Sequence, residues 1–310
     1  MIRPRALRPG DRLAIVAPAS PFGREEFDRG LDELRQLGFV PVFDDRVFAR
    51  RSYVAGDPAV RAAAFGDAWR DPSIAGIVAA RGGYGSVQVL PWLDRDAMRR
   101  TPKVFVGYSD VTSLLSFLTT GCGLVAFHGP TVAGRFERGA EGYDRDTFLR
   151  AVMRAEPLGE LAPASLETVR RGQAAGPLLG GTLTQLAASL GTPYAFLPPP
   201  GCVLFLEDVG ERPYRLDRLL TQLRLAGILA PAAGLVFGEM RGCDEPGGGP
   251  SARAVIGDVL ADFPGPVLFG FPSGHTTGPA WTLPFGVTAR VIGGDRPRLV
   301  MDEAAVEAGT

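Results

Sequence analysis

One serine of this chain lies where a strand is expected to run directly into a helix. The apolar run 104–107 predicts a buried β-strand, and the apolar spacing from Val111 to Leu118 predicts a helix that begins just after Ser109. A hydroxyl at such a corner is exposed above the end of a parallel sheet, and the helix N-terminus directs backbone N–H groups at an oxyanion formed there. Ser109 is therefore a candidate nucleophile.

The residues around this serine match the hydrolase elbow G-x-S-x-G only in part. Gly107 and Ser109 have the required spacing, but Val111 stands where the second glycine belongs. Serine and aspartate are also common caps at helix N-termini. Taken alone, the segment leaves two interpretations open, in which Ser109 is a nucleophile or Ser109 or Asp110 caps the helix.

A nucleophilic serine needs a base within hydrogen-bond reach and a third group that orients the base. His275 follows the predicted strand 267–269 in a glycine-rich turn, where a histidine can project toward a crevice or remain solvated. Glu207 ends the apolar strand 203–206, and a carboxylate there needs a fixed partner because burying an unpaired charge is costly. These two residues are the candidate base and acid.

Two neighbours of these candidates have competing interpretations. Asp208 follows Glu207 directly and could cap the next helix instead of doing chemistry. His128 ends the predicted strand 125–128, so it is either a core histidine with a satisfied hydrogen bond or a residue that lines the same crevice. With only two histidines in the chain, no three-histidine metal site is possible, and neither a metal nor a cofactor is expected.

A glycine-rich loop follows the predicted strand 74–80. Its residues, Arg81-Gly82-Gly83-Tyr84-Gly85, let backbone N–H groups approach a ligand closely, either to hold a phosphate or to complete an oxyanion hole. The spacing is not the G-x-G-x-x-G of dinucleotide-binding folds. The N–H of Asp110 together with that of Gly82 or Gly83 would supply the two donors that acyl transfer requires.

Strands and helices that alternate along the first half must position these residues. This alternation predicts βαβ units in a parallel sheet, whose ligands bind outside the carboxyl ends of the strands. The expected strands are 13–17, 39–43, 74–80 and 104–107, and the first expected helices are 27–37 and 59–69. We assign residues 1–155 to this α/β domain.

The alternation of predicted strands and helices is interrupted between the two halves of the chain. Residues 156–176 are rich in Pro and Gly and sustain neither a helical nor a strand period, which predicts an interdomain linker. Residues 177–310 would form a second domain, which carries Glu207 and His275. Within it, 244–251 is expected to be an exposed loop or lid.

Composition excludes several classes of partner. The 310 residues carry a formal net charge of −1, so no electrostatic argument favours nucleic acid or an anionic membrane surface, and a small neutral or zwitterionic ligand fits better. No signal-like apolar region and no run of 18 apolar residues is present. The cysteines, Cys122, Cys202 and Cys243, have no disulfide or metal spacing, which predicts reduced thiols in a cytoplasmic protein.

Taken together, these motifs resemble the LD-carboxypeptidase family of serine peptidases, which also contains the microcin C self-immunity peptidases. The likeness is carried by six segments in this order: 81–85, 107–110, 127–130, 178–181, 206–211 and 274–276. The resemblance implies Ser109 as nucleophile, His275 as base, Glu207 as its orienting acid, and the amides of Gly83 and Asp110 as the oxyanion hole. It also implies a flavodoxin-like N-terminal domain, a smaller β-rich C-terminal domain and a homodimer.

The resemblance further implies cleavage of a small peptide. One branch of the family releases the terminal D-alanine of murein tetrapeptide during cell-wall recycling in the cytoplasm, and the other cleaves peptidyl-nucleotide antibiotics. The segment 180–186 is more similar to the murein branch, although Thr182 stands where asparagine is more frequent, a departure expected to leave the triad untouched. An aromatic clamp from Trp281 or Phe285 would favour the nucleotide branch.

The sequence leaves open which residues bind the substrate and whether the chain is an enzyme. Candidate substrate-binding residues are Arg81, Gly82, Tyr84, His128 and Arg212, with the arginines as possible partners of substrate carboxylates. A non-catalytic module that binds a small ligand on the same scaffold is the alternative from another functional class.

Overall fold

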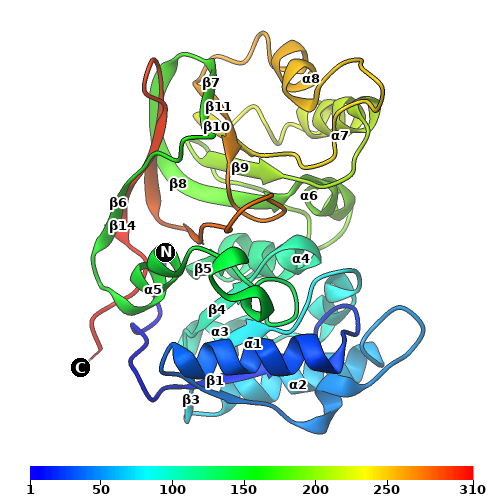
Figure 1. The fold of residues 1–310 in the computed structure, drawn as a ribbon, viewed down its shortest axis with the longest axis vertical. Coiled ribbons are helices and arrows are strands. Elements are labelled where there is room, and N and C mark those ends of the chain that lie inside the picture. Colours follow the sequence, from blue (N-terminus) through cyan, green and yellow to red (C-terminus); the bar gives the residue numbers. More distant parts are fainter. Residues whose placement is uncertain (310) are drawn as a thin grey trace.

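Five parallel strands form the centre of the N-terminal lobe in the computed structural model, which describes residues 1–309 (Figure 1). Their spatial order is β2-β1-β3-β4-β5, the order of flavodoxin-like doubly wound sheets, so the predicted fold class is confirmed. The strands are β1 (Arg12–Val16), β2 (Val40–Val42), β3 (Ile74–Ala79), β4 (Val104–Gly107) and β5 (Ala126–His128).

Helices pack on this sheet because their apolar residues recur at helical spacing. The first helix buries Phe27, Leu31 and Leu34 on one face. The α-helices of this lobe are α1 (Arg24–Gln36), α2 (Pro58–Arg70), α3 (Arg95–Arg100), α4 (Thr112–Ser116) and α5 (Arg145–Met153). Shorter helical segments are η1 (Asp45–Phe48), η2 (Ser86–Trp92), η3 (Ser109–Val111), η4 (Phe117–Gly121) and η5 (Phe136–Glu141).

The strand order places the candidate residues at one end of the sheet. The chain direction around the sheet reverses between β1 and β3, and doubly wound folds bind ligands outside the carboxyl ends of strands at such a switch point. The glycine loop follows β3, and Ser109 follows β4, the next strand along the sheet. The fold therefore brings the loop and the serine together.

An eight-stranded mixed sheet forms the second lobe, which lies above the first in Figure 1. Its order is β6-β14-β13-β8-β9-β10-β11-β7, and only β8 to β11 run parallel to one another. The parallel strands are β8 (Gly172–Thr182), β9 (Val203–Glu207), β10 (Gly234–Gly238) and β11 (Val267–Phe271). The helices are α6 (Leu183–Ser189), α7 (Pro213–Leu225) and α8 (Ala252–Val259).

The segment 156–176, predicted as a linker, is largely strand. It contains β6 (Pro157–Leu161), β7 (Glu167–Arg170) and the start of β8, and β6 and β7 are the two edge strands of the eight-stranded sheet. Edge strands tolerate Pro and Gly because one row of their backbone groups needs no ladder partner. The same residues that obscured the strand pattern in the sequence are thus compatible with this position.

A strand from the second half of the chain completes the first sheet. The three residues of β12 (Leu283–Phe285) pair antiparallel with β5, with Leu283 opposite His128. The chain then forms β13 (Thr288–Gly293) and β14 (Arg298–Ala304) in the second sheet. The pairing of β12 with the first sheet was not predicted. It holds the turn that carries His275 beside the carboxyl ends of β4 and β5.

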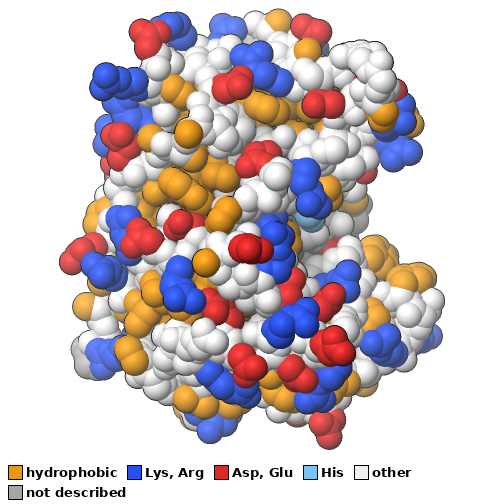
Figure 2. Space-filling model, in the orientation of Figure 1, with side chains coloured by type: hydrophobic (Ala, Val, Ile, Leu, Met, Phe, Trp, Pro, Cys, Tyr) orange, Lys and Arg blue, Asp and Glu red, His pale blue; other side chains and the backbone are white. Residues whose placement is uncertain are grey.

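Figure 2 shows the surface hollowed between the two lobes on one side of the molecule. Charged side chains of both signs are spread over the rest of this face, in keeping with the formal net charge of −1. Among residues 1–309, no helix combines the length and the apolar character that crossing a membrane requires.

Candidate active site

Ser109 has a backbone conformation that is unusual for a residue with a side chain. Its φ is +66°, in the left-handed region, at the turn between β4 and η3. Residues held there cost about 1–3 kcal/mol each and concentrate at functional sites. The elbow geometry thus exists although Val111 replaces the second glycine of the motif.

The glycine loop lies directly against this serine. A Cβ atom added to Gly82 would meet Ser109 Cβ at 2.8 Å and Ser109 Oγ at 3.1 Å, so only glycine fits there. Gly83 has a φ of +101°, and its N–H donates no hydrogen bond within residues 1–309. Asp110 is the second residue of η3, a position where backbone N–H groups lack a partner within the helix.

The Asp110 side chain binds Ser86, the residue that directly follows the glycine loop. Its carboxylate accepts a hydrogen bond from the Ser86 N–H at 2.8 Å, and its backbone oxygen accepts one from the Ser86 hydroxyl. Burial raises the pKa of the Asp110 carboxyl above its usual range. Asp110 therefore does not cap the helix that follows it, as the alternative interpretation suggested; its side chain binds the first residue of η2 and so joins the serine corner to the glycine loop.

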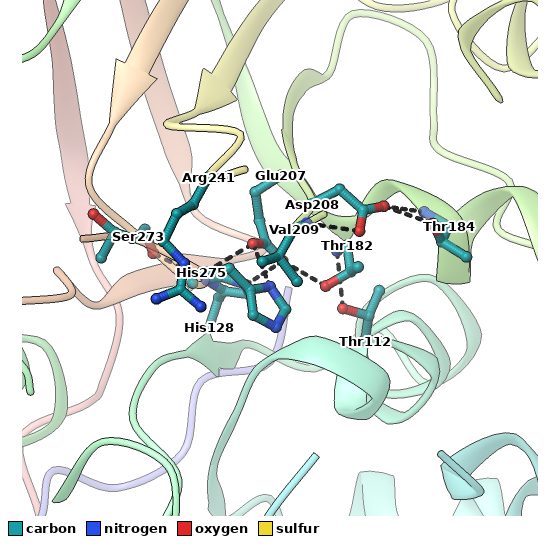
Figure 3. Close-up of polar contacts among 12 residues, drawn as sticks. Thr112, His128, Thr182, Thr184, Glu207, Asp208, Val209, Arg241, Ser273 and His275 are labelled. Carbon is teal, nitrogen blue, oxygen red and sulfur yellow. Dashed lines mark hydrogen bonds and ion pairs between the residues drawn. The ribbon is translucent and has the colours of Figure 1, made fainter. Parts of the chain in front are cut away.

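Glu207, the last residue of β9, pairs with His275 in the turn after β11, and only the Glu207 side chain is fully buried (Figure 3). Glu207 Oε2 lies 2.8 Å from His275 Nδ1 and also accepts the His275 backbone N–H at 2.9 Å. Burial alone would raise the pKa of Glu207, but the charge and hydrogen bonds of His275 lower it to about 2. Burial lowers the pKa of His275, yet the Glu207 charge outweighs burial and raises it above the usual value.

Thr182 contacts this pair, contrary to the expectation that it leaves the triad untouched. Its hydroxyl donates to Glu207 Oε1, and its backbone N–H donates to Thr112 Oγ1 at 3.0 Å (Figure 3). Thr112 begins α4, three residues after Ser109. Thr182 therefore connects the helix of the serine to the acid of the second lobe.

Five of the residues predicted from the sequence line one cavity of about 370 Å³: Arg81, Gly82, Gly83, Ser109 and His275. The base comes from the second lobe and the serine from the first, so tertiary structure brings them to a common space. Tyr108 packs against the base, with its ring centroid 5.2 Å from that of His275.

His128 lies behind the pair and does not line the cavity. Its side chain is fully buried, its Nε2 is 4.0 Å from Glu207 Oε1, and its Nδ1 is 3.0 Å from Ser273 Oγ. Burial lowers the pKa of His128 to about 4, so the ring is neutral near pH 7. The core interpretation of His128 fits this position, and direct contact with a substrate does not.

Two other predicted substrate-binding residues lie outside the cavity lining. Arg212 precedes α7 and pairs with Glu245, which belongs to the exposed loop 244–251. Tyr84 is 44% exposed and packs against Tyr53, with ring centroids 5.7 Å apart. The structure thus brings neither side chain to the serine.

Asp208 does cap a helix, but not the one that follows it. Its carboxylate accepts hydrogen bonds from the Thr184 N–H and hydroxyl, in the first turn of the preceding helix α6. Burial raises its pKa to about 6. The two adjacent carboxylates therefore have different partners: Glu207 binds His275, and Asp208 binds α6.

Arg135 is a residue of this site that no sequence motif indicated. Its guanidinium is buried and donates to the backbone oxygens of Gly274 at 2.7 Å and Thr276 at 2.8 Å, on either side of His275. It also lies 5.9 Å from the centroid of the Tyr108 ring. No sequence pattern links Arg135 to a turn about 140 residues later, so only the fold could reveal this contact.

The two aromatic residues considered as a clamp for a nucleotide base pack against other rings of the protein. Phe285 is fully buried and stacks on His128 with ring centroids 5.4 Å apart, and Trp281 packs against Phe271.

The three cysteines are free and buried. Within the described part of the chain, no group of three or more His, Cys, Asp or Glu side chains is arranged to hold a metal ion.

This arrangement is suited to acyl transfer by a serine. Because Glu207 accepts from His275 Nδ1, the imidazole presents its other nitrogen as a proton acceptor. The cavity also holds a strained serine and backbone N–H groups that could stabilise an oxyanion. These are the parts that nucleophilic hydrolysis of an amide requires.

Comparisons with known proteins agree with this geometry. Residues 13–129 match the LD-carboxypeptidase N-terminal domain, and residues 175–291 match the LD-carboxypeptidase C-terminal domain. A putative carboxypeptidase of Streptomyces coelicolor is 40% identical, over 99% of this chain and 98% of its own length. The murein tetrapeptide carboxypeptidase of Pseudomonas aeruginosa is 34% identical, over 93% and 94%.

One solved structure and one further relative are also similar to this chain. A muramoyltetrapeptide carboxypeptidase from Oxalobacter formigenes superimposes with a TM-score of 0.82 and 28% identity, over 96% of this chain and 100% of its own. The Microcin C7 self-immunity protein of Escherichia coli is 28% identical over 90% of this chain and 89% of its own length.

Proposed function

Because the chain belongs to the LD-carboxypeptidase family and is a serine-type carboxypeptidase, we propose that it releases the terminal D-alanine of murein tetrapeptide by hydrolysing an L,D peptide bond. The observation that carries this proposal is the cavity shared by Ser109 and His275, with His275 held by buried Glu207. A hydroxyl, a base and an orienting acid in this relation supply the nucleophile and the proton transfers that acyl transfer requires.

The proposed reaction has two halves. His275 takes the proton of the Ser109 hydroxyl while Oγ attacks the carbonyl carbon of the scissile bond, and the N–H groups of Gly83 and Asp110 stabilise the oxyanion. His275 then gives the proton to the departing amine of D-alanine, which leaves an ester on Ser109. Water deprotonated by His275 attacks this ester, and the shortened peptide is released with Ser109 restored.

The electrostatics of the pair support this sequence of proton transfers. Glu207 stays ionised because the pKa of its carboxyl is lowered to about 2, so it can stabilise the imidazolium that forms when Ser109 loses its proton. The low accessibility of the pair strengthens this interaction, since the side chains of Glu207 and His275 are 1% and 16% exposed.

Cleavage of a peptidyl-nucleotide is the second candidate, because the Microcin C7 self-immunity protein is also a relative. It is the weaker candidate, since Phe285 is buried beneath the site and Trp281 packs against Phe271. A third candidate, binding without catalysis, is disfavoured by the strained Ser109 beside a histidine base.

The cytoplasm as location and a homodimer as quaternary structure are part of the same proposal. Three buried free cysteines suit a reducing compartment. Subcellular fractionation and analytical ultracentrifugation of the purified chain test these two points.

The test of the function is the release of D-alanine from purified murein tetrapeptide. We expect Ser109→Ala to lower kcat by several orders of magnitude with an unchanged circular dichroism spectrum. Turnover near the wild-type rate in this variant would contradict the assignment, and loss of wild-type activity with a chelator would indicate a metal instead. Parallel assays with a peptidyl-nucleotide decide between the two substrates.

A further inference from the structure

Arg61 is a buried arginine without a carboxylate partner. It belongs to α2, is 3% exposed, and forms no ion pair within residues 1–309. Arg70, at the end of the same helix, is exposed and pairs with Asp67 at 2.9 Å. Because a buried cation is costly unless its donors are matched, the role of Arg61 must lie in the acceptors that it binds.

The Arg61 guanidinium group donates hydrogen bonds to four uncharged oxygen atoms from four segments of the first lobe. Nη1 donates to the backbone oxygens of Pro18 and Gly85, the latter at 2.8 Å. Nε donates to the Gly56 oxygen at 3.2 Å, and Nη2 donates to Gln88 Oε1 at 2.5 Å. A planar guanidinium fixes the directions of its acceptors, so Arg61 holds these segments in one arrangement.

One of these acceptors is the last residue of the glycine loop. Gly85 has a φ of +123°, and a Cβ atom added to it would lie 3.0 Å from Arg61 Nη1. The backbone of the loop therefore packs directly against the guanidinium, with no space for a side chain between them.

Another acceptor, Pro18, leads to the segment that binds the remainder of the loop. Two residues after Pro18, the Ser20 N–H donates to the Gly82 oxygen at 3.2 Å, and Ser20 Oγ accepts the Tyr84 N–H at 3.1 Å. Arg61 thus fixes the glycine loop in two ways, by its bond to Gly85 and through the segment that carries Ser20.

Gly83 lies between these contacts, and its N–H is one of the two donors assigned above to the oxyanion hole. The N–H has no acceptor within residues 1–309, so the conformation of the loop alone decides where it points. Arg61 is not among the described residues that line the reaction cavity. Its guanidinium can therefore affect the reaction only through the loop.

We propose that Arg61 is a positioning residue for the oxyanion hole, whose guanidinium fixes the glycine loop so that the Gly83 N–H points at the carbonyl oxygen of the scissile bond. This inference rests on the proposed function and adds to it a residue outside the cavity. Because the oxyanion forms only in the transition state, a misaligned loop lowers kcat and leaves KM nearly unchanged.

The experiment measures kcat and KM for release of D-alanine from murein tetrapeptide by the wild type, Arg61→Met and Arg61→Lys. Methionine removes every donor, and lysine keeps the charge on one nitrogen atom instead of a planar group of three. Arg70→Met is the matched control, because it removes the same charge from the same helix at an exposed position. Thermal denaturation identifies a temperature at which each variant is folded, and the rates are compared there.

We expect kcat of Arg61→Met to fall about 100-fold, the loss that a displacement of about 1 Å at reacting groups causes, with little change in KM. Arg61→Lys should have an intermediate kcat, since an ammonium group cannot reach all four acceptors at once. Arg70→Met should retain the wild-type values. Arg61→Met should also unfold at a lower temperature, because it leaves buried carbonyl groups without donors.

Three outcomes would overturn the inference. A wild-type kcat in folded Arg61→Met would show that the loop keeps its conformation without the guanidinium. A KM that rises as much as kcat falls would indicate a general loss of structure. A wild-type kcat in Arg61→Lys would show that the charge suffices, and this variant decides the question if Arg61→Met does not fold.

A second measurement separates this inference from the proposed function. If the wild type releases no D-alanine, the proposed function fails, and the rate at which a fluorophosphonate labels Ser109 then tests Arg61. In that reaction Ser109 Oγ displaces fluoride from phosphorus, and the phosphoryl oxygen needs the same N–H donors. Arg61→Met should be labelled about 100-fold more slowly than the wild type. Equal rates, including no labelling of either protein, would contradict the inference.

Discussion

Glu207 binds His275 twice through one oxygen atom. Oε2 accepts the backbone N–H of His275 at 2.9 Å and lies 2.8 Å from its ring Nδ1. The backbone contact sets the position of the turn, and the ring contact sets the tautomer, so one carboxylate orients the base in both respects. Glycine is required beside it, because a Cβ on Gly274 would lie 2.6 Å from Glu207 Cδ.

The pH dependence of activity should reflect this pair. His275 acts as a base only when neutral, and Glu207 raises its pKa above 6.5, so kcat/KM should fall as the pH drops through a value above 6.5. In Glu207→Gln, burial without the opposing charge lowers the pKa of His275. The acid limb should therefore move to lower pH while kcat falls about 10³- to 10⁴-fold. A pH–rate profile measures both effects, and an acid limb that stays in place would refute this coupling.

Gly82 should be intolerant of any side chain. In Gly82→Ala the new Cβ would lie 2.8 Å from Ser109 Cβ, so the serine or the loop must move. A displacement of about 1 Å at reacting groups costs about 100-fold in rate, and we expect kcat to fall at least that far. Gly294→Ala is the control, because no atom lies within 4 Å of its added Cβ. Steady-state kinetics on the two variants make the comparison, and similar rates would show that the contact does not matter.

The Thr182 hydroxyl should stabilise the fold through Glu207. Thr182→Val keeps the shape but removes the donor to a carboxylate that is 1% exposed, and a hydrogen bond to a charged group contributes about 1.5–3 kcal/mol. We expect the free energy of unfolding to decrease by that amount, as measured by denaturant titration. Thr182→Ser retains the hydroxyl and should stay close to the wild type. Equal losses in the two variants would instead indicate packing of the methyl group.

Arg135 should act as a positioning residue for the base. Replacing it by Met removes the donors to Gly274 and Thr276, so we expect kcat to fall about 100-fold with a smaller change in KM. Its charge also lowers the pKa of His275, so the acid limb should move to higher pH in Arg135→Met but not in Arg135→Lys. A loss of activity without this shift would show a purely structural role.

Much of the fold follows from local patterns. Apolar runs located β1, β3, β4 and β9 within about one residue, because both faces of these strands are buried and their residues are uniformly apolar. The strands of 156–176 were not recognisable, since edge strands need no such pattern. The three-residue β12 was also missed, because its pairing with β5 depends on contacts more than 150 residues apart in the chain.

The sequence by itself determined the chemical inventory of the site: a serine at a strand-to-helix corner, glycines at a neighbouring strand end, and only two histidines. These signals are local, because strand ends, turns and glycine spacing depend on residues close together in the chain. Only the tertiary structure decided which groups meet. It placed His128 behind Glu207 instead of in the cavity, and it gave Thr182 and Arg135 their contacts. Those relations join segments from separate lobes, and their energies depend on burial that no short stretch of sequence specifies.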